Sequence, residues 1–182
     1  ACGDDPQPDW PLPERPSLRS ERPLRVFLHP DAGKPEKLWP THRFARVLAD
    51  AARRRPIACT VNGVRRRHVR SLRWRLLASR VRLSVAPFDP SFATLREALS
   101  QSDIAIGCDS GPMHYAAVLG VPTLVVYGRY TAAEFGPPWR SLAVEPPAGC
   151  DADAVSTAAV AAALESLVER MSRDPFVRGQ AA

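Results

Sequence analysis

Short apolar runs alternate with segments of helical periodicity from residue 24 onward. The apolar runs predict strands over residues 24–29, 56–61, 81–86, 103–108 and 122–127. The periodic segments predict helices over about 39–54, 64–79, 91–100 and 153–172, and a further helix that opens at Pro112. This alternation favours an α/β fold, a Rossmann-like parallel sheet with helices on both faces.

The first residues differ from this pattern. Residues 1–23 hold six prolines among polar residues, which predicts an extended linker or a strap on the surface. Residues 24–175 then form one domain, since 182 residues suffice for one hydrophobic core, and residues 176–182 form a tail. Because the sequence starts at Ala1 rather than Met, we expect an excised or processed piece.

Charge and cysteine usage narrow the class of protein. The net charge of +6 suits an anionic partner such as a nucleotide diphosphate, a phosphorylated lipid surface or nucleic acid. The four cysteines form no CxxC pair and no zinc spacing, so we expect no metal site and a reducing, cytoplasmic setting with Cys59 and Cys108 buried. No apolar run approaches the roughly 18 to 20 residues of a membrane span, and the N-terminus does not resemble a signal peptide.

In a parallel sheet, ligands bind beyond the carboxyl ends of the strands. The loop after strand 103–108 reads Asp109, Ser110, Gly111, Pro112, Met113, His114. Pro112 suits a first helical turn, Ser110 or Gly111 can cap it, and the helix start favours a phosphate. The carboxylate of Asp109 is better suited to sugar hydroxyls. These residues could equally cap a helix, with His114 packed inside.

Two other loops meet the same edge. The loop after strand 24–29 carries Lys37, whose ammonium could neutralise a diphosphate, and Lys34 as a weaker candidate. We expect Trp39 to pack at the helix start. The loop after strand 122–127 carries Gly128 and Thr131, which could contact a nucleotide or form a plain turn.

An arginine-rich stretch covers residues 65–82 and is open to two interpretations, an anionic lipid or acceptor surface or a solvated helix face. Nucleic-acid binding is disfavoured because no aromatic-interleaved basic motif occurs. The arginines of this stretch are Arg65, Arg66, Arg67, Arg70, Arg73, Arg75, Arg80 and Arg82. The sequence also lacks the GxGxxG, GxxxxGK[ST] and GxSxG motifs.

Two motifs resemble the heptosyltransferases. HPDAGKPEKLWPTHRFARVLADAA resembles the segment that opens the second domain of that family, and SDIAIGCDSGPMHYAAVLGVPTLVVYG resembles its D-[ST]-G-x-x-H-x-A-A-x-x-G-x-P-T segment. GRYTAAEFGPPW and DADAVSTAAVAAALESL are similar to its continuation and closing helix. The resemblance covers most of residues 24–172.

The resemblance implies one half of a GT-B fold, the donor-binding domain of an inverting, metal-independent glycosyltransferase that uses ADP-heptose and a lipopolysaccharide core acceptor and needs no cofactor. Carried over by residue, Lys37 would hold the diphosphate and Asp109 the donor sugar. Ser110 and Gly111 would offer N–H groups to the phosphates, and His114 would support the turn. We expect a cytoplasmic protein at or near the inner face of the membrane.

The sequence departs from the family pattern at three points, and these limit which residue roles can be assigned by resemblance. The acceptor domain, which supplies the catalytic aspartate in the family, is missing, so no catalytic residue is assigned and the acceptor half is expected in a separate chain or a removed segment. The loop at 61–67 lacks the family's acidic residue near the ribose. Arg129 and Tyr130 replace a proline and threonine. A stand-alone, degenerate nucleotide-sugar module with a regulatory or partner-binding role therefore stays an alternative, as does a sugar-nucleotide epimerase.

Overall fold

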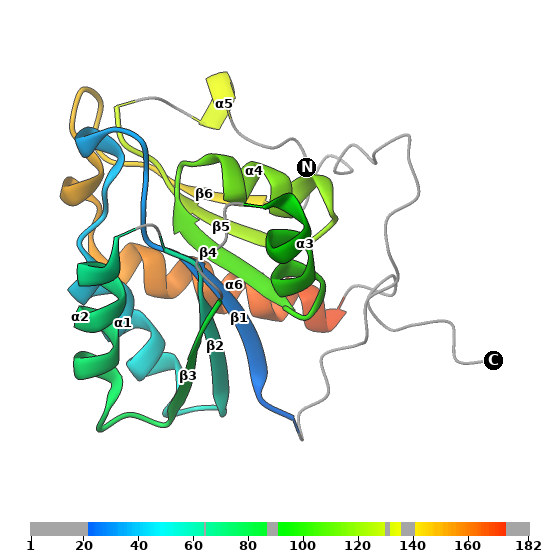
Figure 1. Cartoon of the computed structure of the whole chain (residues 1–182). Helices are drawn as coiled ribbons and strands as arrows, with labels where there is room; N and C mark the ends of the chain where they lie inside the picture. The colour runs from blue at the N-terminus through cyan, green and yellow to red at the C-terminus, as the bar shows by residue number, and fades with distance from the viewer. Residues whose placement is uncertain (1–21, 64, 87–90, 130–131, 136–140, 174–182) are drawn as a thin grey trace.

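The computed structural model describes residues 22–63, 65–86, 91–129, 132–135 and 141–173. Six strands form one parallel sheet in the order β3-β2-β1-β4-β5-β6 (Figure 1). The strands are β1 (Leu24–His29), β2 (Ile57–Val61), β3 (Val81–Val85), β4 (Ile104–Cys108), β5 (Thr123–Val126) and β6 (Ser141–Val144). The predicted Rossmann-like fold class is confirmed.

Helices cover both faces of the sheet (Figure 1). On one face lie the long helices α1 (Thr41–Ala51), α2 (Arg66–Leu76) and α6 (Thr157–Arg173). They share one hydrophobic core with the strands. On the other face, α3 (Phe92–Ser100) and α4 (Gly111–Val118) form a second, smaller core. The short elements are α5 (Ala132–Phe135) and two 3-10 turns, η1 (Pro35–Lys37) and η2 (Ala152–Ala154).

Three of the predicted helices differ from the structure by two or more residues at an end. The helix predicted over about 64–79 spans only Arg66–Leu76. Two helices begin later than predicted for a clear local reason. We expected α1 to begin at Trp39, but Pro40 takes an extended conformation as the N-cap, and the helix begins at Thr41. A residue before proline is disfavoured in a helix, so Trp39 stays outside. Likewise α6 begins at Thr157 rather than near residue 153, because η2 and an extended Val155 precede it.

Trp39 packs at the start of α1, as predicted. Its ring is buried and lies edge-on to Phe44, with ring centroids 4.6 Å apart. The indole Nε1 donates to the carbonyl of Val155 at 3.0 Å, which satisfies the polar end of the side chain and ties α1 to the chain before α6. The side chain is therefore part of the core and does not offer a stacking surface.

The sequence pattern did not reveal β6. This strand has only four residues, and only Val144 is buried, because β6 lies at the edge of the sheet. A half-exposed edge strand has no long apolar run by which to recognise it. The predicted linker at 1–23 and tail at 176–182 lie outside the described residues, apart from residues 22 and 23.

Cys59 and Cys108 are buried, as predicted, and burial raises the pKa of both thiols to about 12. They therefore stay protonated and act as small apolar side chains. Within the described residues, no helix is both long and apolar enough to cross a bilayer.

The strand order fixes where a ligand crevice is expected. From β1 the chain proceeds outward to β2 and β3, then returns to β4 beside β1 and proceeds outward again to β5 and β6. The order therefore reverses between β1 and β4. In open α/β sheets this reversal point is where the loops diverge and leave a crevice at the carboxyl ends of the strands.

At the opposite end of β1 and β4, one carboxylate joins the two strands. Asp103 is buried and accepts hydrogen bonds from the guanidinium groups of Arg22, at 2.8 and 2.9 Å, and Arg25, at 3.0 Å, and from the backbone N–H of Arg25, at 2.8 Å. Burial by itself raises the pKa of Asp103, but these hydrogen bonds outweigh it and hold the pKa below its usual value.

We expect Asp103→Asn to lower the free energy of unfolding by about 1–3 kcal/mol, since two guanidinium groups lose their anion. The folded pKa lies below the unfolded one, so the stability from Asp103 is complete above about pH 4 and is lost as the pH falls through the folded pKa. Urea unfolding of the variant and wild type at neutral pH and in acid measures both the loss of stability and its dependence on pH. Equal stability of variant and wild type at neutral pH would contradict the assignment.

Candidate functional site

Asp109 and Lys37 meet at the point where the strand order reverses. Asp109 directly follows β4 and is buried, and Lys37 is the last residue of η1, in the loop after β1. The Nζ of Lys37 lies 2.5 Å from Oδ2 of Asp109. The other carboxylate oxygen, Oδ1, lies 3.0 Å from Nε2 of His114, one turn into α4. Both oxygens of Asp109 therefore have a partner.

The environment of Asp109 keeps it ionised. Burial by itself raises the pKa of the carboxyl, but the hydrogen bonds and charges of His114 and Lys37 outweigh this effect, and the pKa lies below its usual value. At neutral pH the site therefore presents an anion next to an ammonium group. Such a pair can contact both hydroxyl groups and phosphate oxygens of a ligand.

The turn from β4 into α4 depends on close packing. A Cβ at Gly107 would lie 2.5 Å from the carbonyl oxygen of His29 and 2.8 Å from Sδ of Met113. Glycine at this position therefore lets the end of β1 and Met113 of α4 both lie close to the backbone of β4. The Sγ of Cys108 accepts from the backbone N–H of Trp39 at 3.3 Å, which holds the start of α1 to the end of β4.

The tip of α4 is open. Ser110 occupies the N-cap position, as predicted, but its hydroxyl donates to the carbonyl of Cys108 at 3.0 Å instead of capping an N–H group. Pro112 is in the first turn, and Gly111 is exposed, with no atom within 4 Å of where a Cβ would lie. A ligand can therefore approach the backbone of Gly111 closely.

Gly128, just after β5, supports the turn that carries Lys37. A Cβ at Gly128 would lie 2.3 Å from the carbonyl oxygen of Glu36 and 3.3 Å from Cα of Lys37. The residue is buried beneath η1 rather than presented to a ligand. The close approach is thus a packing contact that positions Lys37.

The structure brings most of the predicted site residues together. Lys37, Asp109 and His114 form one hydrogen-bonded group, and Ser110, Gly111 and Pro112 form the adjoining helix start. Lys34 lies exposed at the beginning of η1. Thr131 lies outside the described residues. His114 is partly exposed and bonded to Asp109, so it is not packed inside the core.

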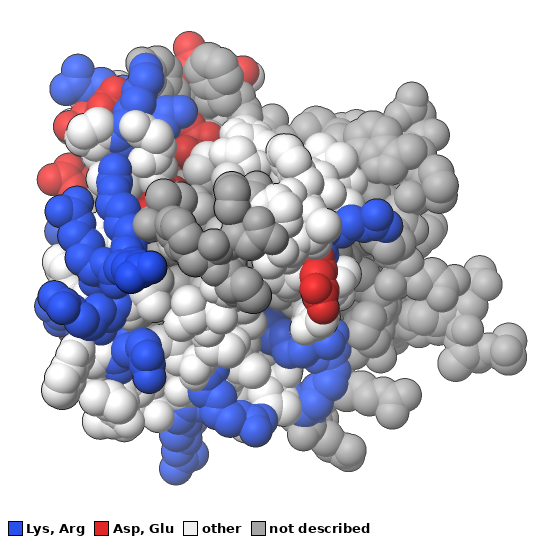
Figure 2. All heavy atoms as spheres, in the orientation of Figure 1, with Lys and Arg blue, Asp and Glu red and all other residues white. Residues whose placement is uncertain are grey.

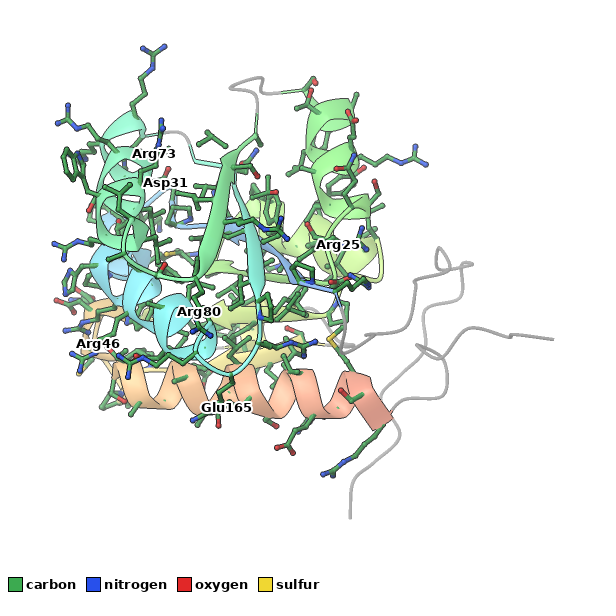
Figure 3. The ribbon with its side chains drawn as sticks, turned by 90° about the horizontal axis from the view of Figure 1, so that it is seen from below. Arg25, Asp31, Arg46, Arg73, Arg80 and Glu165 are labelled. Atoms are coloured by element: carbon green, nitrogen blue, oxygen red, sulfur yellow. The ribbon has the colours of Figure 1, made fainter. Side chains whose placement is uncertain are left out.

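A second polar group, which the sequence did not reveal, lies at the ends of β1 and β2. The buried carboxylate of Asp31 lies 2.5 Å from Nδ1 of His68 and accepts from the backbone N–H of Arg65 at 3.0 Å (Figure 3). The Arg65 guanidinium lies 3.8 Å from the same carboxylate. Asp31 therefore ties the loop after β1 to the start of α2. Only the position of Asp31 after a strand hinted at this role.

His29 and Asn62 border this group. Nδ1 of His29 lies 3.1 Å from Oδ1 of Asn62 and links the ends of β1 and β2. Burial lowers the pKa of His29, and the smaller opposing effects of Asn62 and the Asp31 charge do not offset it. The ring is therefore neutral at neutral pH and acts as a hydrogen-bonding link.

A cavity of about 380 Å³ opens on the outer side of η1. It is lined by Pro35, Glu36, Leu38, Arg129, Asp151 and Asp153. Arg129 donates to Asp151 at 2.8 Å across its wall.

Within the described ranges, no cluster of three or more His, Cys, Asp or Glu residues could hold a metal ion.

Solved structures share this fold. The chain superposes on E. coli ADP-heptose LPS heptosyltransferase II with a TM-score of 0.71 at 18% identity, covering 85% of this chain and 49% of that one. E. coli heptosyltransferase WaaC with ADP gives a TM-score of 0.67 at 19% identity, covering 86% of this chain and 46% of that one. A glycosyl transferase family 9 protein from Veillonella parvula gives a TM-score of 0.67 at 21% identity, covering 81% of this chain and 46% of that one. The chain thus spans about half the length of these proteins.

No curated protein sequence matches this chain. The family profile described as glycosyltransferase family 9 (heptosyltransferase) matches residues 5–147, which include β1 to β6 with both site loops. With the fold and the profile in agreement, the chain belongs to glycosyltransferase family 9, the heptosyltransferase family.

Proposed function

We propose that this chain binds a nucleotide-diphosphate sugar, with an ADP-sugar such as ADP-heptose favoured, as the donor-binding domain of an inverting, metal-independent glycosyltransferase. The contact between Lys37 and Asp109 across the reversal point of the sheet carries the proposal. It joins a cation suited to phosphate and an anion suited to sugar hydroxyls at the edge where α/β sheets bind ligands.

The diphosphate would lie between the Lys37 ammonium and the tip of α4. The positive end of the helix dipole and the backbone N–H groups near Gly111 favour negative charge there. As the bond to the donor sugar breaks, negative charge grows on the leaving diphosphate, and a cation already in place stabilises it. E. coli heptosyltransferase WaaC, which shares the fold, has been solved with ADP, and this supports an adenosine diphosphate.

The donor sugar would lie against Asp109. An ionised carboxylate accepts hydrogen bonds from hydroxyl groups, but it repels phosphate, so its place is beside the sugar. His114 holds one carboxylate oxygen and fixes the orientation of the group. A ligand would exchange part of the Lys37 contact for its own phosphate and hydroxyl groups.

The acceptor would bind in a second domain. The chain spans about half the length of the solved family members, and we assign no catalytic base among the residues that the structure describes. We propose that an acceptor domain, in the same polypeptide or in a separate chain, supplies the base and binds the acceptor glycan or glycolipid. Lipopolysaccharide assembly at the inner face of the cytoplasmic membrane is the setting that the family suggests.

A regulatory nucleotide-sugar module is the second candidate. One observation favours it: the carboxylate of Asp31, which lies close to Gly63 just after β2, is already bound by Arg65 and His68. A ribose would therefore have to compete for it. Transfer activity after addition of an acceptor domain distinguishes an enzyme half from a module that only binds.

We expect Lys37→Ala to weaken ADP binding by about tenfold to a hundredfold, because a charge-assisted contact to the diphosphate is lost. Adenosine binding should change little. Titration calorimetry with both ligands measures this difference. Arg46→Ala, which removes an exposed cation from α1 outside the proposed site, is the matched control. Equal ADP affinity of Lys37→Ala and wild type would remove Lys37 from the site.

We expect Asp109→Asn to leave ADP affinity within about threefold of wild type, or to raise it, since a repelling charge is removed. The same change should weaken an ADP-sugar by about tenfold, because the hydrogen bonds from sugar hydroxyls to a carboxylate are lost. Calorimetry with ADP and ADP-heptose compares the two. Loss of both affinities together with a lower melting temperature would indicate a collapsed turn instead.

We expect Gly128→Ala to destabilise the fold by about 1–3 kcal/mol, because the new methyl group would overlap the backbone of Glu36. Since η1 must shift to accommodate it, ADP affinity should fall as well. Gly33→Ala lies in the same loop with nothing within 4 Å and serves as the control. Thermal melts with and without ADP report both effects, and unchanged values for Gly128→Ala would refute the support role.

A further inference from the structure

We propose that the outer face of α2 is a docking surface for an anionic phospholipid membrane. The face comprises six residues of α2 and its C-cap, and we name it the α2 face. These residues are Arg66, Arg67, Arg70, Arg73, Trp74 and Leu77. The residues changed in its test, 70–77, lie further along α2 than Arg65 and His68, so the test does not depend on the proposed function.

The α2 face is not needed to hold the helix on the domain. Leu72 and Leu76 lie on the opposite side of α2 and are buried in the main core. The positions 66, 70, 73, 74 and 77 recur at helical spacing and lie together on the outer side. Arg73, labelled on α2 in Figure 3, is exposed.

Two large apolar side chains interrupt the arginines. Trp74 and Leu77 are each 72% exposed, the highest values among the exposed large hydrophobic residues described. Single exposed apolar side chains are common, but these two lie three residues apart on one helix face, next to Arg70 and Arg73. Tryptophan and leucine beside arginines form the pattern with which an interfacial helix inserts among lipid headgroups.

The charge of this region has one sign. Residues 51–88 hold eleven arginines and no aspartate or glutamate. Figure 2 shows basic side chains gathered on the side of the molecule where α2 lies. Arginines at i and i+4, such as Arg66 and Arg70, repel one another on an isolated helix, and an anionic partner relieves that repulsion.

A membrane fits these features better than a nucleic acid. Phosphates alone would account for the arginines, and a base could stack on Trp74, but neither accounts for Leu77. A lipid headgroup layer offers phosphate to the arginines and apolar chains to both Trp74 and Leu77.

The experiment is flotation of the full 182-residue chain with vesicles of phosphatidylcholine alone or with one third phosphatidylglycerol. We expect binding to the anionic vesicles that weakens with salt. Arg70→Gln with Arg73→Gln should weaken it roughly thirtyfold, since each basic residue near an anionic membrane contributes about fivefold. Trp74→Ser with Leu77→Ser should weaken it by about tenfold or more.

Matched controls come from the helices elsewhere in the fold. Arg96→Gln with Arg170→Gln removes the same charge from exposed positions of α3 and α6 and should leave vesicle binding nearly unchanged. The α2 variants should keep the ADP affinity of wild type, so a failure here and a failure of nucleotide binding are measured separately.

Four outcomes would overturn the proposal. One is absence of wild-type binding to anionic vesicles at low salt. The second is equal loss of binding in the control pair and the arginine pair. The third is full binding after Trp74→Ser with Leu77→Ser, which would indicate charge alone. The fourth is tighter binding to a single-stranded oligonucleotide than to vesicles at equal salt, which would assign the α2 face to nucleic acid.

Discussion

The ion pair between Lys37 and Asp109 is the contact on which the site depends. It joins two loops that are 72 residues apart in the chain and that meet only because the sheet places β1 beside β4. A buried carboxylate without a partner would be costly, so Lys37 and His114 stabilise the turn that Asp109 begins. The same contact holds a cation at the carboxyl edge of the sheet, so the proposed ligand site and the fold share one interaction.

The sequence predicted the parts of the fold that bury long apolar runs. Strands such as β1 and β4 match to within a residue, because continuous apolar runs identify buried parallel strands. The edge strand β6 and the 3-10 turn η1 were not predicted, since neither buries a periodic face. Helix starts were missed where local backbone preferences, such as those around Pro40, outweighed the apolar pattern.

For the candidate site, strand-end position and the family resemblance singled out Lys37 and Asp109, which lie in contact, but the sequence did not predict which side chains pair. The role of Gly128 is an example: a glycine after a strand looked like a ligand contact or a plain turn, and the packing shows that it lies under η1. Asp31 was overlooked because its partners, Arg65 and His68, come from a distant helix. The partners of a buried carboxylate such as Asp31 are set by which strands and helices lie side by side, and the local sequence pattern does not reveal this.

The backbone of η1 rests directly on Gly128, and this has a consequence for protein engineering. Residues 34–38 pack directly against the start of the loop after β5, so a shift of one segment shifts the other, although about 90 residues separate them in the chain. A chimera that transplants the first loop from a relative without a glycine at the second position would displace its own lysine. Exchange of donor preference between members of this family should therefore move both segments together.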